Sequence, residues 1–166
     1  MPVLFGEIKA SIIRGSSLAV AATLFLNIII IHLFFKKAKY TLLVMLPVTL
    51  GFLFVPGIMG YINAPFNFIN IGTLALLFGL GVDYGIYVMN AFLMEERRDA
   101  GSALRLSGKN VMMCAATTVA GCGSLITAKF AGIASVGLVL TIGAVFCAAA
   151  ALLTLPALLY LFGDKL

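Results

Sequence analysis

Residues 79–88, GLGVDYGIYV, place one ionisable carboxyl inside a stretch that is otherwise apolar, aromatic or glycine. Asp83 is the only charged residue from Phe68 to Met94. Low-dielectric surroundings disfavour the charged form of a carboxyl, so the group can change protonation state where its neighbours allow it. Asp83 could therefore carry protons, or it could be a permanently paired acid that stabilises a helix bundle.

The helical position of Asp83 determines which side chains accompany it. The residues that share its face, at roughly 100° per residue, are Gly72, Leu76, Gly79, Tyr87 and Asn90. Tyr84 points about a quarter turn away from this face. Gly81 and Gly85 form a GxxxG step on the opposite side, where a second helix could pack closely, and we expect Gly79 to be a further helix-packing residue.

A second stripe of small and polar residues follows at three- and four-residue spacing. Its members are Asn110, Cys114, Thr117, Gly121, Ser124 and Ala128. Close helix packing, with Gly121 at a contact, is one interpretation of this stripe. The hydroxyls of Thr117 and Thr118 could also hydrogen-bond a carboxyl or a water on a neighbouring helix. We therefore expect Asp83 to face the bundle interior, with a network that could include Thr117, Thr118, Tyr87 and Asn90.

The elements that would position these residues are membrane spans. The chain of 166 residues is 63% hydrophobic and 10% charged, whereas soluble domains are about 45–50% apolar and about 25% charged. Apolar runs long enough to cross a bilayer, which needs about 20 residues, cover residues 17–35, 40–60, 68–94, 110–128 and 133–162. The sequence predicts an all-α polytopic membrane bundle of five transmembrane helices. Asp83 then lies roughly 22 Å from Phe68 and 16 Å from Met94, near the bilayer midplane.

The ends of the chain suggest an orientation. Residues 1–16 alternate apolar and polar positions with a helical period, and we expect an amphipathic helix on the outer membrane surface. An orientation with the N-terminus outside and the C-terminus in the cytoplasm puts eight basic residues inside and three outside. Glu7 precedes the first apolar run and no signal peptide is visible, so we expect the chain to be the C-terminal part of a longer protein.

Several function classes are disfavoured by the residue types. The net charge of +5 comes from basic residues between apolar runs, so nucleic acid is not an expected partner. His32 is a single histidine, and the three cysteines lie in apolar segments without metal-ligand spacing. No nucleophile and base occur at motif spacing, so we expect neither an enzyme, a metal site nor a cofactor.

Four segments resemble a known family in their order and pattern. GLGVDYGIYVMNAFLMEE resembles the aspartate–tyrosine motif in the fourth or tenth span of RND-superfamily exporters of the MMPL type, relatives of SecDF and Patched. Residues 46–71 resemble the preceding span and its outer loop, and residues 110–143 resemble the next hairpin with its TT…G.GSL pattern. LLTLPALL resembles the closing helix.

The resemblance implies a role for the chain. It would form spans 8–12 of a twelve-span transporter of the bacterial inner membrane, with Asp83 and Tyr84 as the proton-relay pair. Such exporters use the proton-motive force to move lipids or other hydrophobic molecules. The implied partners are membrane lipids, the missing N-terminal half with its periplasmic domain, and optionally further copies of the chain in a homo-oligomer. A sterol-sensing-like domain, a SecDF-like domain and a structural fragment without transport remain alternatives.

Overall fold

The computed structural model describes residues 2–62, 68–95 and 100–162 of the chain, and these residues are almost entirely helical. The elements are α1 (Pro2–Phe35), α2 (Ala38–Tyr61), α3 (Phe68–Met94), α4 (Ala100–Ser124), the short 3-10 helix η1 (Leu125–Thr127) and α5 (Ala131–Phe162). Each of the five α-helices contains a stretch long and apolar enough to cross a membrane. The prediction of an all-α polytopic bundle is therefore confirmed.

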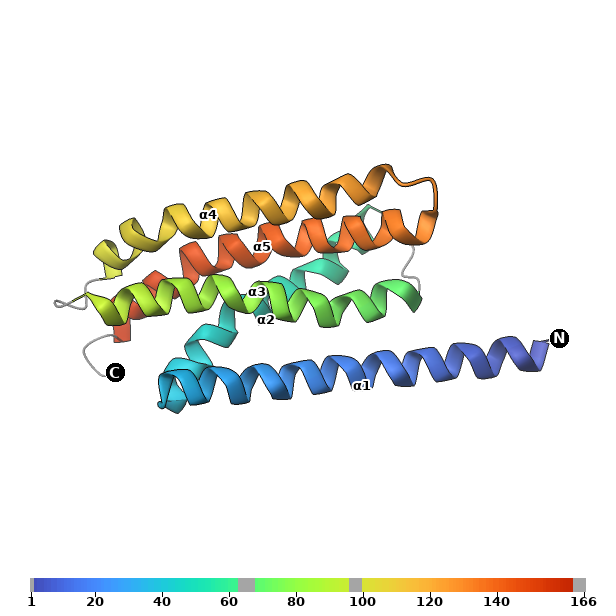
Figure 1. Ribbon diagram of the computed structural model, residues 1–166, viewed down its shortest axis with the longest axis horizontal. Helices are drawn as coiled ribbons and strands as arrows, with labels where there is room; N and C mark the ends of the chain where they lie inside the picture. The colour runs from blue at the N-terminus through green and yellow to red at the C-terminus, as the bar shows by residue number, and fades with distance from the viewer. Residues whose placement is uncertain (1, 63–67, 96–99, 163–166) are drawn as a thin grey trace.

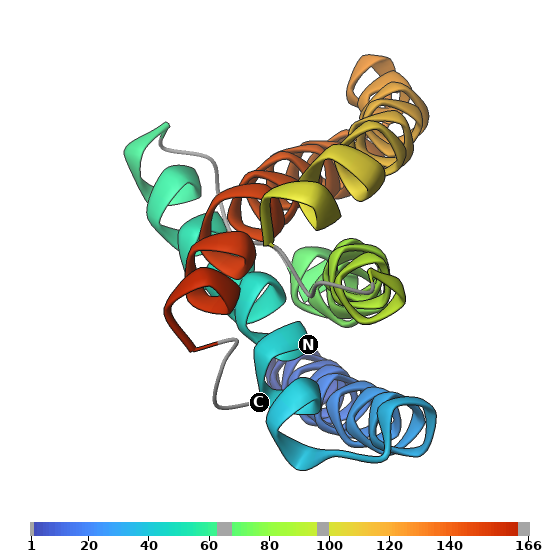
Figure 2. The ribbon, with the colours of Figure 1, turned by 90° about the vertical axis from the view of Figure 1, so that its left-hand side faces the viewer.

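Helices α3 and α5 form the centre of the bundle, and the other three helices pack around them. The axes of α1, α3, α4 and α5 are nearly parallel, whereas α2 crosses them obliquely (Figure 1). Both α3 and α5 pack against α2 and α4, and α3 also packs against α1. In the end-on view of Figure 2, α3 lies between α1 and α4, and α5 lies between α4 and α2. No further helix among the described residues covers the outward side of α3.

Two helices extend beyond the spans expected from the sequence. The boundary drawn at residue 16 is not a helix end, because α1 continues unbroken from Pro2 to Phe35. Helix α4 begins at Ala100 instead of residue 110. Its added turns carry Ala103 and Ser107 on the same face as Val111, and all three are buried. Burial of this face explains why the helix begins before the apolar run.

Close backbone packing at glycines joins α2, α3 and α5. A Cβ atom added at Gly81 would lie 2.6 Å from the Val48 Cγ2 atom of α2 and 2.9 Å from the Cys147 Sγ atom of α5. A Cβ added at Gly85 would lie 2.6 Å from the backbone oxygen of Val44. Cys147 also lies directly against Gly51 of α2. Side chains larger than hydrogen are therefore excluded where α3 meets its two neighbours.

We predict that Gly85→Ala destabilises the purified chain by about 1–3 kcal/mol, because the new methyl group would collide with backbone rather than with a movable side chain. Unfolding in detergent, followed by circular dichroism during titration with a denaturing detergent, measures the change. Gly121→Ala is the matched control.

At Gly121 an added Cβ would meet no atom within 4 Å. The control substitution should therefore leave stability unchanged or raise it by up to about 1 kcal/mol, from the better helix propensity of alanine. Equal stability of the two variants would contradict the close approach of α3 to α2.

Candidate functional site

The sequence GVDYG gives α3 two chemically different faces. Positions two residues apart on a helix differ by about 200°, so Asp83 lies nearly opposite both Gly81 and Gly85. These two glycines are buried against α2 and α5. The contact at the glycines consequently turns the Asp83 side chain away from the centre of the bundle.

Asp83 is exposed in the structure, although the sequence predicted that it would face the bundle interior. That expectation is wrong for the bundle of this chain, because helical phase relates residues to one another but does not show which face is covered. The structure records neither a hydrogen bond nor an ion pair for the Asp83 carboxyl within the described ranges. The acid is thus not paired with any residue that the structure describes.

The exposed face of α3 carries the stripe that was read from the sequence. Leu76 is 59% exposed and Tyr87 is 45% exposed, and Gly79 and Asn90 are exposed with them. The Asn90 side-chain amide lies 3.6 Å from the Met94 sulfur on the same helix. Asp83, Tyr87 and Asn90 therefore form a polar row along an uncovered surface, which continues through Gly79 and Leu76.

The stripe on α4 is also largely exposed. Thr117 is exposed and donates to carbonyl oxygens of its own helix, at 3.1 Å to Met113 and 2.9 Å to Cys114. Gly121 and Ser124 are exposed as well. The interpretation of Gly121 as a contact with the third span is corrected, since an added Cβ would meet no neighbour there, and the same holds for Gly79. These small residues leave room on the outer surface instead of mediating contacts within the described bundle.

Tyr84 occupies the interior, a quarter turn from Asp83. Its side chain is fully buried and interacts electrostatically with Asp83, Cys114 of α4 and Cys147 of α5. The Tyr84 hydroxyl has no hydrogen-bond partner among the described residues. The nearby Thr118 hydroxyl interacts with it, in a geometry that falls short of a hydrogen bond, and itself donates to the Cys114 carbonyl at 2.9 Å. Rotation of either side chain could complete a Tyr84–Thr118 hydrogen bond.

Sequence reasoning missed one residue of this interior. Cys147, one of the three cysteines expected only as small residues in apolar segments, fills the space beneath Gly81. The Thr141 hydroxyl of α5 is buried without a hydrogen-bond partner in the described structure. A single polar residue in a long apolar span gives no periodic signal, so Thr141 could not be assigned from spacing. No group of three His, Cys, Asp or Glu side chains that could hold a metal ion occurs in the part of the chain that the structure describes.

Comparison with known proteins places this arrangement in a family. The model of the MMPL family matches residues 2–166. The "Putative membrane protein MJ1562" of Methanocaldococcus jannaschii is 33% identical over 138 residues, which cover 80% of this chain and 36% of that protein. The "Apo-petrobactin exporter" of Bacillus anthracis is 30% identical over 157 residues, which cover 86% of this chain and 21% of that protein.

The chain thus spans about a third and about a fifth of the length of these two relatives. No solved structure matches it significantly. The family match extends over nearly every residue and includes the five apolar helices and the aspartate–tyrosine pair. The chain is therefore an integral membrane protein of the MMPL family.

Proposed function

We propose that the chain is the membrane part of an exporter driven by the proton-motive force, in which Asp83 takes up and releases the proton. The observation that carries the proposal is the placement of Asp83. It is a lone carboxyl near the middle of a span, it has no ion-pair partner among the described residues, and its neighbour Tyr84 holds a buried hydroxyl without a hydrogen bond. A permanently structural acid would need a partner, and the described residues provide none.

The uncovered face of α3 requires a second membrane element. A charge that faces lipid at midspan costs about 2.5–3.5 kcal/mol on insertion scales. Gly79 and Gly121 add no side-chain bulk on this surface, which suits close approach of another helix. Either the remainder of a longer transporter or a second copy of the chain could supply that helix. Asp83 would then lie at the interface between two membrane halves.

Proton movement at such an interface can drive a conformational change. The ionised carboxyl favours an arrangement that gives it water or hydrogen-bond donors, and the neutral acid favours a drier and more tightly packed one. One charge that crosses the membrane potential supplies about 2.3 kcal/mol per 100 mV, which is sufficient to bias two states of similar energy. Because α3 is closely packed on α2 and α5 at its glycines, a shift of α3 would carry those helices with it.

The proposed cargo is a lipid or another hydrophobic molecule. One relative is named for export of apo-petrobactin, so cargo that is not a membrane lipid is compatible with this family. We place the chain in a bacterial inner membrane, with its N-terminus outside and its C-terminus in the cytoplasm. The distribution of basic residues between the apolar runs supports this orientation.

Asp83→Asn should leave the fold intact and abolish proton-coupled export. The amide keeps the size of the side chain but cannot titrate, and removal of a midspan charge should leave stability equal or slightly higher, while transport falls to less than about a tenth. The measurements are uptake into inverted membrane vesicles that contain the complete gene product, driven by an imposed pH gradient, and the melting temperature of the purified protein.

Asp83→Glu serves as the conservative control and should keep measurable coupling, because the glutamate still titrates. Normal transport by the asparagine variant would refute the relay. A variant that fails to fold while the glutamate variant folds would instead identify Asp83 as a structural acid.

Tyr84→Phe should impair transport and yet not destabilise the protein. Loss of a buried hydroxyl that has no hydrogen bond should leave stability unchanged or raise it by about 1 kcal/mol. Transport should fall by about tenfold or more if the hydroxyl orients or passes the proton of Asp83. The same vesicle assay and melting measurement apply.

Tyr87→Phe is the matched substitution on the same helix, where the hydroxyl lies on the exposed face. It should have the milder effect on transport. The opposite order would assign the proton path to the exposed polar row and would exclude the buried hydroxyl.

A further inference from the structure

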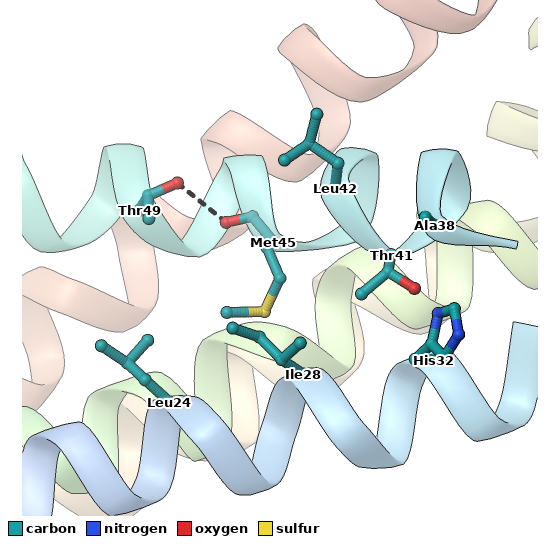
Figure 3. A pocket seen from close by; sticks show the side chains of 8 residues that line it. All are labelled: Leu24, Ile28, His32, Ala38, Thr41, Leu42, Met45 and Thr49. Atoms are coloured by element: carbon teal, nitrogen blue, oxygen red, sulfur yellow. Dashed lines mark hydrogen bonds between the residues drawn. The ribbon is translucent and has the colours of Figure 1, made fainter.

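A groove separates α1 from α2 at one end of the bundle (Figure 3). Its volume is about 420 Å³, and it is lined by Leu24, Ile28 and His32 of α1 and by Thr41, Met45 and Thr49 among the residues of α2. This volume lies within the range of about 300–1,000 Å³ that is typical of small-molecule sites. Ile28 is 45% exposed and Leu42 is 74% exposed, so the groove opens to the outer surface of the bundle.

The groove results from the oblique path of α2. The two helices are joined through Lys36 and Lys37 alone, and Lys36 has the left-handed φ of 55° that reverses the chain there. From this turn α2 leads away from α1 (Figure 1). In the close-up, the ring of His32 and the side chain of Thr41 lie at the lysine end, and Leu24 and Thr49 lie at the far end.

The length of the groove along α1 is close to the thickness of the hydrocarbon in one leaflet of a bilayer. Leu24 and His32 are eight residues apart on α1, which is about 12 Å along the helix. Half of a hydrocarbon core of about 30 Å is about 15 Å. The lining is almost entirely apolar. Its two threonine hydroxyls donate to backbone carbonyl oxygens, that of Thr41 to Lys37, directly before α2, at 3.3 Å and that of Thr49 to Met45 at 2.8 Å. The groove is therefore better suited to hold a hydrocarbon chain than water.

The positive charge at the lysine end of the groove favours an anionic headgroup. Lys36, Lys37 and Lys39 lie at its closed end, and the sequence has no acidic residue between Glu7 and Asp83. The Lys37 ammonium donates to the Tyr40 hydroxyl at 3.2 Å and lies 4.9 Å from the centre of its ring, and the side chains of all three lysines are exposed. Basic clusters directly beside a membrane span attract anionic lipid headgroups.

We propose that this groove is a binding site for one anionic phospholipid from the leaflet on the lysine side. An acyl chain lies between α1 and α2, and the phosphate lies at Lys36 and Lys39. A transmembrane helix is the less suitable occupant, because a helix about 10–12 Å across would need roughly 900 Å³ or more over the same 12 Å. The inference concerns a surface remote from Asp83 in sequence and does not depend on proton transfer.

Native mass spectrometry of the full 166-residue chain in detergent tests the site with dioleoylphosphatidylglycerol and dioleoylphosphatidylcholine as probes. The phosphatidylglycerol adduct should form with an affinity about tenfold higher. The double variant Lys36→Asn/Lys39→Gln should remove this preference but still bind both lipids weakly. Asparagine suits the left-handed backbone at position 36, so loss of the fold is not expected there.

Ile28→Trp should fill the groove and reduce binding of both lipids about tenfold, since a larger side chain takes the place of the acyl chain. Ile30→Trp is the matched control, because Ile30 lies on the same helix, is 59% exposed and does not line the groove. Helix content by circular dichroism verifies folding of every variant.

Equal affinity of the parent chain for the two lipids would overturn the proposal, as would unchanged binding by Ile28→Trp. A stable dimer without lipid adducts, which Ile28→Trp converts to monomer, would also overturn it and would assign the groove to a second copy. The double lysine variant keeps the proposal testable if the tryptophan variant does not fold.

Discussion

The contact between the backbone of α2 and two glycines of α3 determines the rotation of α3, and with it the direction of every side chain on that helix. Gly85 leaves no room for a Cβ atom beside the Val44 carbonyl, and Gly81 leaves none between Val48 and Cys147. With these two positions turned inward, Asp83 must face outward, because it lies about 160° from each of them. A small rotation would bring the carboxyl closer to the bundle centre but would separate α3 from both neighbours. The orientation of the acid is therefore a property of the glycine contact rather than of the acid itself.

The same rotation divides the candidate site between two environments. Tyr84 enters the space between α3, α4 and α5, where its hydroxyl lies beside Thr118 and has no hydrogen bond to a described residue. Asp83 lies on the surface that no described helix covers. A proton that passed between them would move from an interface into an interior. This division suits a group that is ionised in one state of a cycle and neutral in another, because water access on the two sides can differ.

Hydrophobic run length was sufficient to predict the five helices, since spans of about 20 apolar residues have few alternatives in a bilayer. The sequence placed the start of α4 at residue 110, because the charged residues Arg105 and Lys109 lie outside the apolar run, whereas the first turns of the helix depend on burial of Ala103, Ser107 and Val111. The depth of Asp83 in its span followed from counting residues. The direction in which its side chain points did not follow, because both sides of α3 carry glycines and either side could pack against another helix. The groove at His32 depends on the crossing angle of α2, which no local pattern encodes.

The unbroken course of α1 has a mechanical consequence. A helix of 34 residues is about 51 Å long, whereas the hydrocarbon core is about 30 Å thick. Some 20 Å of α1 therefore extends past the hydrocarbon as a rigid continuation of the span, with no hinge at residue 16. Rigid rods behave as levers: a small tilt of the part inside the bilayer displaces the projecting end sideways. Any domain attached at that end would be moved directly by the span, without a flexible linker to absorb the displacement.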